Sequence, residues 1–117
     1  MTIASATRRL AAAGCVYAEE EASILAEAAD TVEELDAMLA RRAAGAPLEY
    51  VVGWADFRGL RLAVSEGVFV PRPRSGFRVE EAASLTRCIS GPGRPVVVVD
   101  LCCGVGAIGA ALAAENS

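Results

Sequence analysis

The residues best suited to chemistry lie in a short loop between a branched apolar run and an alanine-rich segment. Asp100 ends the run Val96–Val99, and Gly104, Gly106 and Gly109 follow at short intervals. Glycine has no Cβ, so such a loop can take positive φ angles and bring its backbone close to a ligand. A helix beginning after the loop would point its free N–H groups into the same space. The spacing therefore predicts a small-molecule site at the end of a buried strand.

Two ligand classes and one ligand-free interpretation fit this loop. The pattern Gly104-x-Gly106-x-x-Gly109 matches the dinucleotide fingerprint, in which glycines surround a pyrophosphate. That fingerprint usually begins directly after the strand, whereas three residues separate Asp100 from Gly104. An acidic strand end followed by Gly-x-Gly resembles instead the first motif of class I S-adenosylmethionine methyltransferases. The third interpretation is a strand and a small-residue helix that pack closely without any ligand.

Composition argues against several other chemistries. The 117 residues carry a net charge of −4, all 11 basic residues are arginine, and histidine is absent. Without histidine the usual general base near neutral pH and the commonest metal ligand are missing, so we predict no metal site. The four cysteines form no Cys-x-x-Cys pair, which favours reduced thiols in a cytoplasmic protein. Asp100 and the glycines interrupt the longest apolar run, so we predict no membrane association.

Charge is distributed unevenly along the chain. Residues 1–46 contain four arginines and eight acidic residues, whereas residues 57–78 contain five arginines and Glu66 as their one acid. The basic stretch is a candidate surface for an acidic or phosphate-bearing partner, although such stretches are more often solvated faces.

Periodicity predicts the elements that must position the loop. Helices are expected near 3–13, 19–29 and 32–43, the last with a capping box from Thr31 to Glu34. Alternating apolar residues predict hairpin strands over Tyr50–Phe57 and Leu60–Val64, joined by the turn Arg58-Gly59. Beyond them we expect a helix near 76–88, a strand over 96–101 and a helix from about residue 107. The predicted domains are a helical domain (1–46), a hairpin and proline-rich connector (47–73) and a third segment (74–117).

Four groups of residues, taken in order, resemble one family. They are Pro47-Leu48-Glu49-Tyr50-Val51-Val52-Gly53, Phe57-x-Gly59-Leu60, Gly67-Val68-Phe69-Val70-Pro71-Arg72-Pro73, and Asp100-Leu101 with Gly104-x-Gly106-Ala107-Ile108. In order and spacing they resemble the protein N5-glutamine methyltransferases of the HemK/PrmC family. The resemblance implies an α/β fold with a small N-terminal helical domain, a β-hairpin connector and, over residues 74–117, the beginning of a Rossmann-like class I methyltransferase domain.

The resemblance also implies a function. Such an enzyme uses S-adenosylmethionine to methylate the side-chain amide of a glutamine in a peptide-chain release factor, so its partner is a protein and it binds no nucleic acid directly. Phe69 and Arg72 would border the active site, and the cofactor's methionyl end would be lined by Asp100, Cys102, Cys103, Gly104, Val105 and Gly106. Two alternatives are a non-catalytic binding module for a release factor or another protein, and part of an NAD-type oxidoreductase.

Three departures from the family pattern affect these expectations. Cys102 stands where the family usually has the first small glycine of the loop, and its Cβ restricts the backbone. After Pro73 the family commonly has an acid, a hydroxyl residue and a glutamate, where this chain has Arg74-Ser75-Gly76. The family's Asn-Pro-Pro-Tyr tetrapeptide, which holds the target amide, is absent, so no catalytic residue is assigned in this chain. We therefore expect the chain by itself to be inactive, to lack tight S-adenosylmethionine binding, and to self-associate through its apolar strand.

Overall fold

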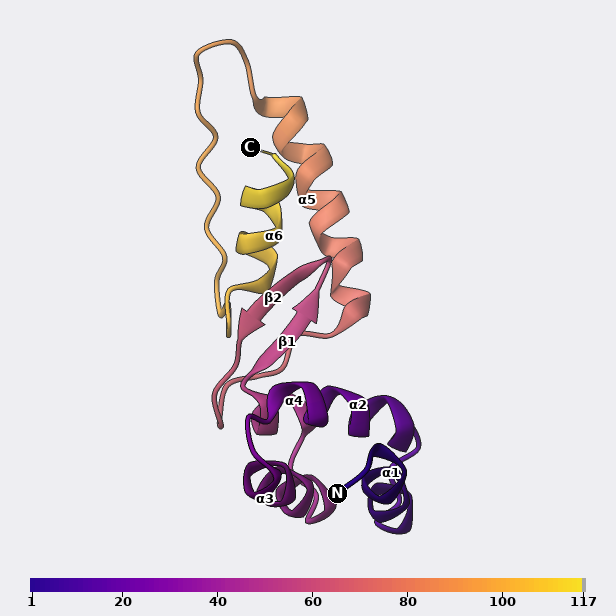
Figure 1. Cartoon of the computed structure of the whole chain (residues 1–117). Helices are drawn as coiled ribbons and strands as arrows, with labels where there is room; N and C mark the ends of the chain where they lie inside the picture. The colour runs from indigo at the N-terminus through magenta and orange to yellow at the C-terminus, as the bar shows by residue number, and fades with distance from the viewer. Residues whose placement is uncertain (117) are drawn as a thin grey trace. The chain divides into compact units, whose positions relative to one another are not determined.

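The computed structural model describes residues 1–116 and contains nine helical and strand elements within them (Figure 1). In chain order they are α1 (Ile3–Ala12), α2 (Ala18–Ala28), α3 (Val32–Ala43), α4 (Leu48–Val52), β1 (Trp54–Phe57), β2 (Leu60–Ala63), the 3-10 helix η1 (Pro73–Ser75), α5 (Gly76–Ile89) and α6 (Ala107–Glu115). The chain divides into two units, Met1–Gly53 and a second that begins at Trp54. Each unit has its own apolar core.

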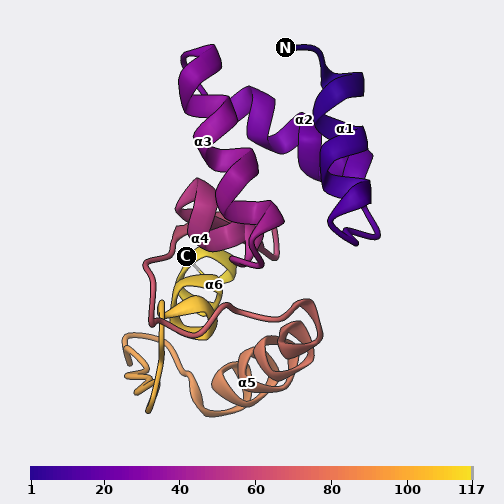
Figure 2. The same cartoon turned by 90° about the horizontal axis from the view of Figure 1, so that it is seen from below.

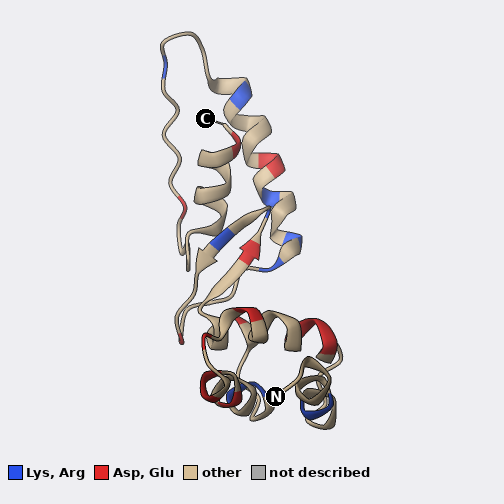
Figure 3. Ribbon diagram, in the orientation of Figure 1, with Lys and Arg blue, Asp and Glu red and all other residues tan. Residues whose placement is uncertain are grey.

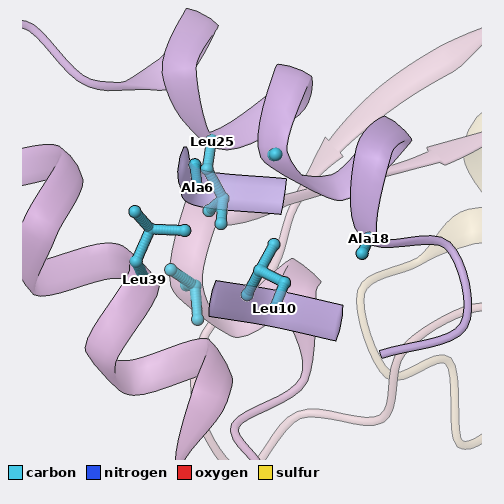
Figure 4. Packing of buried hydrophobic residues seen from close by; sticks show 7 residues of the cluster. Ala6, Leu10, Ala18, Leu25 and Leu39 are labelled. Carbon is cyan, nitrogen blue, oxygen red and sulfur yellow. The ribbon is translucent and has the colours of Figure 1, made fainter. Parts of the chain in front are cut away.

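The first unit packs α1 to α4 around small and branched side chains (Figure 4). The capping box predicted at the start of α3 is half formed. The Thr31 side chain accepts a hydrogen bond from the Glu34 amide over 3.1 Å, while the Glu34 carboxylate accepts from the Asp30 amide over 2.9 Å. The first bond satisfies a donor that the first turn of α3 would otherwise leave free, whereas the Glu34 carboxylate bonds the amide of Asp30 instead of the Thr31 amide that a capping box would use. The three predicted helices are confirmed to within one residue at each end. The buried core consists of Ala6, Leu10, Ala18, Ala22, Leu25, Leu39 and Val51.

The segment before the hairpin differs from the sequence prediction. Tyr50–Val52 is helical and forms the end of α4, so the first strand begins at Trp54 instead of Tyr50. Gly53 ends α4 in the left-handed conformation, with a φ of 81° that glycine adopts without steric cost. Val51 is buried in the core of the first unit. This packing outweighs the preference of valine and tyrosine for strands, because strand propensity depends strongly on context.

The second unit places a β-hairpin against two helices. Strands β1 and β2 are antiparallel with Phe57 opposite Leu60, and the turn residues Arg58 and Gly59 have φ angles of 47° and 79°. The predicted two-residue hairpin turn is therefore confirmed, as are the helices now labelled α5 and α6, which lie side by side (Figures 1 and 2). Phe57 is buried in the core of this unit, together with Val79, Ala83, Ala107, Ala111 and Leu112.

Arg58 fastens the hairpin turn to both helices. Its guanidinium donates hydrogen bonds to the Glu115 carboxylate at the end of α6, the shortest over 2.6 Å. It also donates to the Gly76 carbonyl over 3.2 Å and to the Glu80 carboxylate over 3.3 Å, both in α5. Hydrogen bonding to Glu115 is the largest cause of a raised Arg58 pKa. One side chain thus fixes three elements of the second unit.

The segment Val96–Leu101 does not form the predicted strand. It follows an extended path beside α6 (Figure 1), but within residues 1–116 the sheet consists of β1 and β2 alone. A strand needs a neighbour with which to exchange backbone hydrogen bonds, and no described segment pairs with this one. The start of a Rossmann-like sheet is therefore not formed by these residues.

The side chains of this segment still alternate between two sides. Val97, Val99 and Leu101 expose 86%, 74% and 82% of their surface. Val96 and Val98 instead line a cavity next to Gly109 and Leu112 of α6. The sequence predicted a strand buried on both faces, whereas this segment exposes one side to solvent and leaves Val98 48% exposed on the other. Within residues 1–116, no helix is both long enough and apolar enough to span a bilayer.

Candidate functional site

Every second residue of the loop between Asp100 and α6 has a left-handed backbone. Cys102, Gly104 and Gly106 have φ angles of 55°, 59° and 78°. The Gly106 amide donates to the Cys103 carbonyl over 2.9 Å, which closes the turn immediately before α6. The positive φ angles expected for both glycines are confirmed, and the alternation of left-handed residues leaves Cys102, Cys103 and Gly104 exposed.

Cys102 adopts a conformation that suits glycine. For an L-residue with a Cβ, the left-handed region costs roughly 1–2 kcal/mol because the Cβ lies too close to the following carbonyl oxygen. Among residues 1–116 the one other non-glycine residue with a positive φ is Arg58, in the hairpin turn. Cys102 was a departure from the family pattern in the sequence, and in the structure this departure places a residue with a Cβ in a left-handed backbone.

Asp100 caps the helix that follows the loop. Its Oδ2 accepts a hydrogen bond over 3.1 Å from the amide of Gly109, the third residue of α6. A carboxylate at this point satisfies a free N–H group and interacts favourably with the positive end of the helix dipole. A Cβ built on Gly109 would lie 3.5 Å from Asp100 Oδ2, so the third glycine of the motif marks a close approach of helix and extended segment. Sequence reasoning missed this bond, although the spacing from Asp100 to Gly109 was visible.

The candidate border residues lie beside the loop. A Cβ built on Gly104 would lie 3.6 Å from the carbonyl oxygen of Phe69, so the two backbones are neighbours. The Arg72 guanidinium carbon lies 5.7 Å from the centre of the Phe69 ring, a distance compatible with a cation–π interaction. The structure thus brings Phe69, distant in sequence, to the side of the Gly104 turn, and places Arg72 next to Phe69.

A cavity of about 570 Å³ lies between the extended segment and the helices α5 and α6. Its lining residues come from the end of α5, from the extended segment and from α6, and they include Thr86, Arg87, Arg94, Val96, Val98 and Leu112. Cys102–Gly106 is not part of this lining. Within residues 1–116 no cluster of three or more Cys, Asp or Glu side chains is arranged to hold a metal ion.

Comparison with known proteins bears on the family. No protein-family model matches the chain. The release factor glutamine methyltransferase of Streptomyces coelicolor is 39% identical over 130 aligned residues, which cover 97% of this chain and 44% of that protein. The protein of the same name from Bifidobacterium longum is 48% identical over 80 residues, which cover 68% of this chain and 26% of that protein.

The chain is a homologue of the release factor glutamine methyltransferases. A third relative of this name, from Escherichia coli, is 41% identical over 84 residues, covering 72% of this chain and 28% of that protein. The resemblance drawn from the four sequence motifs is therefore confirmed. The chain spans between about a quarter and just under half of the length of these relatives.

Proposed function

We propose that this chain supplies the first cofactor-binding loop of a methyltransferase that modifies a glutamine side-chain amide in a peptide-chain release factor. S-Adenosylmethionine is the proposed cofactor, and the loop Asp100–Gly106 is its proposed site. The observation that carries the proposal is the loop's left-handed backbone at Gly104 and Gly106, placed directly before α6 in a homologue of release factor glutamine methyltransferases.

The residues present fit the amino-acid end of this cofactor. A Cβ on Gly106 would meet no atom within 4 Å, so the loop offers open space on that side. The first two amides of α6, from Ala107 and Ile108, form no hydrogen bond with a described group and can donate to a carboxylate. Asp100 holds α6 in this orientation through Gly109. When bound, the cofactor would supply an electrophilic methyl group on a sulfonium.

The chain's own contribution is positioning. Transfer to an amide nitrogen gains most of its rate from holding the amide and the methyl group in line, so the absence of histidine is no obstacle. Phe69 lies next to Gly104 and Arg72 lies over the Phe69 ring, and we propose that an amide-bearing segment approaches along these two residues. The residues that grip the amide itself are not assigned in this chain.

A titration followed by NMR tests the cofactor assignment on the 117-residue chain. We expect S-adenosylmethionine to shift the amide resonances of Gly104, Gly106 and the start of α6, with weak affinity, and NADH to leave them unchanged. Gly104→Val should abolish the shifts, because a branched side chain at a φ of 59° distorts the turn and points toward Phe69. Gly93→Val is the matched control, since Gly93 has a similar φ of 72° and open space around it in a different loop.

Replacing the matched segment of the Streptomyces coelicolor relative with this chain tests the reaction. The chimera should methylate release factor, and Gly104→Val within it should remove that activity while Gly93→Val retains it. Shifts caused by NADH but not by S-adenosylmethionine would instead favour a dinucleotide site. If neither ligand shifts the resonances and the Gly104→Val chimera keeps its activity, the loop only packs α6 against the extended segment and binds no ligand.

A further inference from the structure

A group of exposed arginine and aromatic side chains lies between β2 and the first turn of α5. This arginine–aromatic patch consists of Phe69, Arg72, Arg74, Phe77 and Arg78, and all five side chains are exposed. The basic residues gather at the start of α5 and in the segment that leads to it (Figure 3). No acidic residue occurs between Glu66 and Glu80, so the three arginines of this stretch are not interspersed with acids.

The arginines of the patch have no partner among the described carboxylates. Three arginines outside the patch do form such pairs: Arg9 with Asp36, Arg42 with Glu21, and Arg58 with Glu115. In the patch, Arg72 lies over the Phe69 ring, and within residues 1–116 none of the three arginine side chains forms an ion pair. Three guanidinium groups are therefore free to form bidentate hydrogen bonds with carboxylates of another molecule.

The aromatic members strengthen the case for an interface. Phe69 and Phe77 expose 68% and 66% of their surface, although both are large apolar side chains. Aromatic residues and arginine are the types enriched where proteins bind one another, because they combine apolar area with directional polar contacts.

The position of the patch connects it to the candidate cofactor loop. Phe69 lies against Gly104, so the patch reaches the loop at this residue. Arg74 replaces an acid of the family pattern, which reverses the charge that this surface presents. We infer that the arginine–aromatic patch binds an acidic segment of the substrate protein and guides the neighbouring glutamine to the loop. The guiding role rests on the proposed function, whereas binding of an acidic peptide does not.

The test measures peptide binding by the full chain in the absence of cofactor. The probe is a short fluorescein-labelled peptide rich in glutamate, with leucines and a central glutamine, observed by fluorescence anisotropy at low ionic strength. The variant Arg74→Glu/Arg78→Glu should raise its Kd by about tenfold or more, since two attractions become repulsions. The control Arg87→Glu/Arg94→Glu makes the same change in net charge on exposed residues of the same unit and should change the Kd by less than about twofold.

A second pair of variants tests the aromatic contribution. Phe77→Ala should weaken binding about fivefold, whereas Leu85→Ala, which removes an equally exposed side chain from the same helix, should leave the Kd unchanged. Unchanged circular dichroism and Trp54 fluorescence would show that each variant is folded. Because neither side chain is buried, no loss of core packing is expected.

Three results would overturn the inference. The first is equal weakening by the two double-arginine variants, which would show attraction to net charge alone. The second is unchanged binding of the same peptide with every glutamate replaced by glutamine. The third is tighter binding of oligouridine of similar length, which would assign the patch to nucleic acid. Because no cofactor is present, a failed S-adenosylmethionine titration leaves a positive peptide result standing, and the two proposals fail separately.

Discussion

The left-handed backbone of Cys102 gives a quantitative prediction about the stability of the candidate loop. Cys102 and Cys103 are adjacent and exposed, but only Cys102 has a positive φ, at 55°. Changing either residue to glycine adds freedom to the unfolded chain, which lowers stability by about 0.4–1 kcal/mol. Cys102→Gly also removes a steric cost of roughly 1–2 kcal/mol, whereas Cys103→Gly removes none. The entropy terms cancel between the two variants, so Cys102→Gly should be more stable than Cys103→Gly by about 1–2 kcal/mol.

Urea unfolding and thermal melting under reducing conditions both measure this difference in stability. Trp54, the single tryptophan of the chain, lies in the same unit as the loop and reports its unfolding by fluorescence. For a unit of this size, a difference of 1 kcal/mol corresponds to a shift in Tm of about 4–8 °C, well above the error of a melting experiment. Cys102→Gly should therefore melt above the unmodified chain, and Cys103→Gly should melt below it.

Equal melting temperatures for the two glycine variants would refute the reasoning, because the only difference assigned to them is the left-handed backbone of Cys102. If Cys102→Gly is less stable than the unmodified chain, the thiol makes a contact whose stabilising free energy exceeds the steric cost of the left-handed backbone. Cys102→Ala separates these cases, since alanine keeps the Cβ and removes the sulfur. It should behave like the unmodified chain if the Cβ is the source of the cost.

Three further predictions follow from other contacts. Gly109→Ala should stabilise the second unit by about 0.5–1 kcal/mol, because glycine inside a helix is less favourable than alanine by about that amount and the added Cβ would make only an ordinary contact with Asp100. Destabilisation in the same urea assay would show that the packing of Asp100 on α6 requires glycine. Glu21→Gln should cost about 1–3 kcal/mol, measured by helical circular dichroism with exposed Glu20→Gln as control, since it weakens the Arg42 bonds of 2.7 and 3.1 Å. The Arg42 pKa is raised chiefly by this hydrogen bond. The stabilisation is therefore fully present below the ordinary arginine pKa and is lost only as pH rises through the raised pKa of the folded state. The loss of stability caused by Glu21→Gln should consequently be the same at about pH 6 and at about pH 9. Val97→Lys/Val99→Lys should reduce self-association in sedimentation velocity, and association that persists in this variant would place the contact elsewhere.

Local signals in the sequence predicted most of the helices and the hairpin turn. Thr31 and Glu34 start α3 through short-range hydrogen bonds, and the turn at Arg58 and Gly59 follows from the need for two positive φ angles. The loop before α6 was equally predictable, because the glycine spacing encodes its left-handed turns. In each case the determining contacts lie within a few residues of one another along the chain.

Contacts between distant residues account for what the sequence did not reveal. The hydrogen bonds from Arg58 to Gly76 and Glu115 could not be predicted from the sequence, since they depend on where α5 and α6 pack. The neighbourhood of Phe69 and Gly104 likewise exists only after the second unit has folded. Residue types and their spacing along the chain do not predict such contacts, because each residue has many possible partners of suitable chemistry.

The sequence by itself determined the elements whose stability is local and the family to which the motifs point. Tertiary structure decided the two segments rich in branched residues, which have similar strand preference and different outcomes. Tyr50–Val52 became helical because Val51 could be buried among the helices of the first unit. Val96–Leu101 stayed extended but unpaired, because a strand is completed by hydrogen bonds to a neighbour and no described segment supplies them. Branched side chains set a preference for extended backbone, and the available packing and hydrogen-bond partners decide whether that preference is realised.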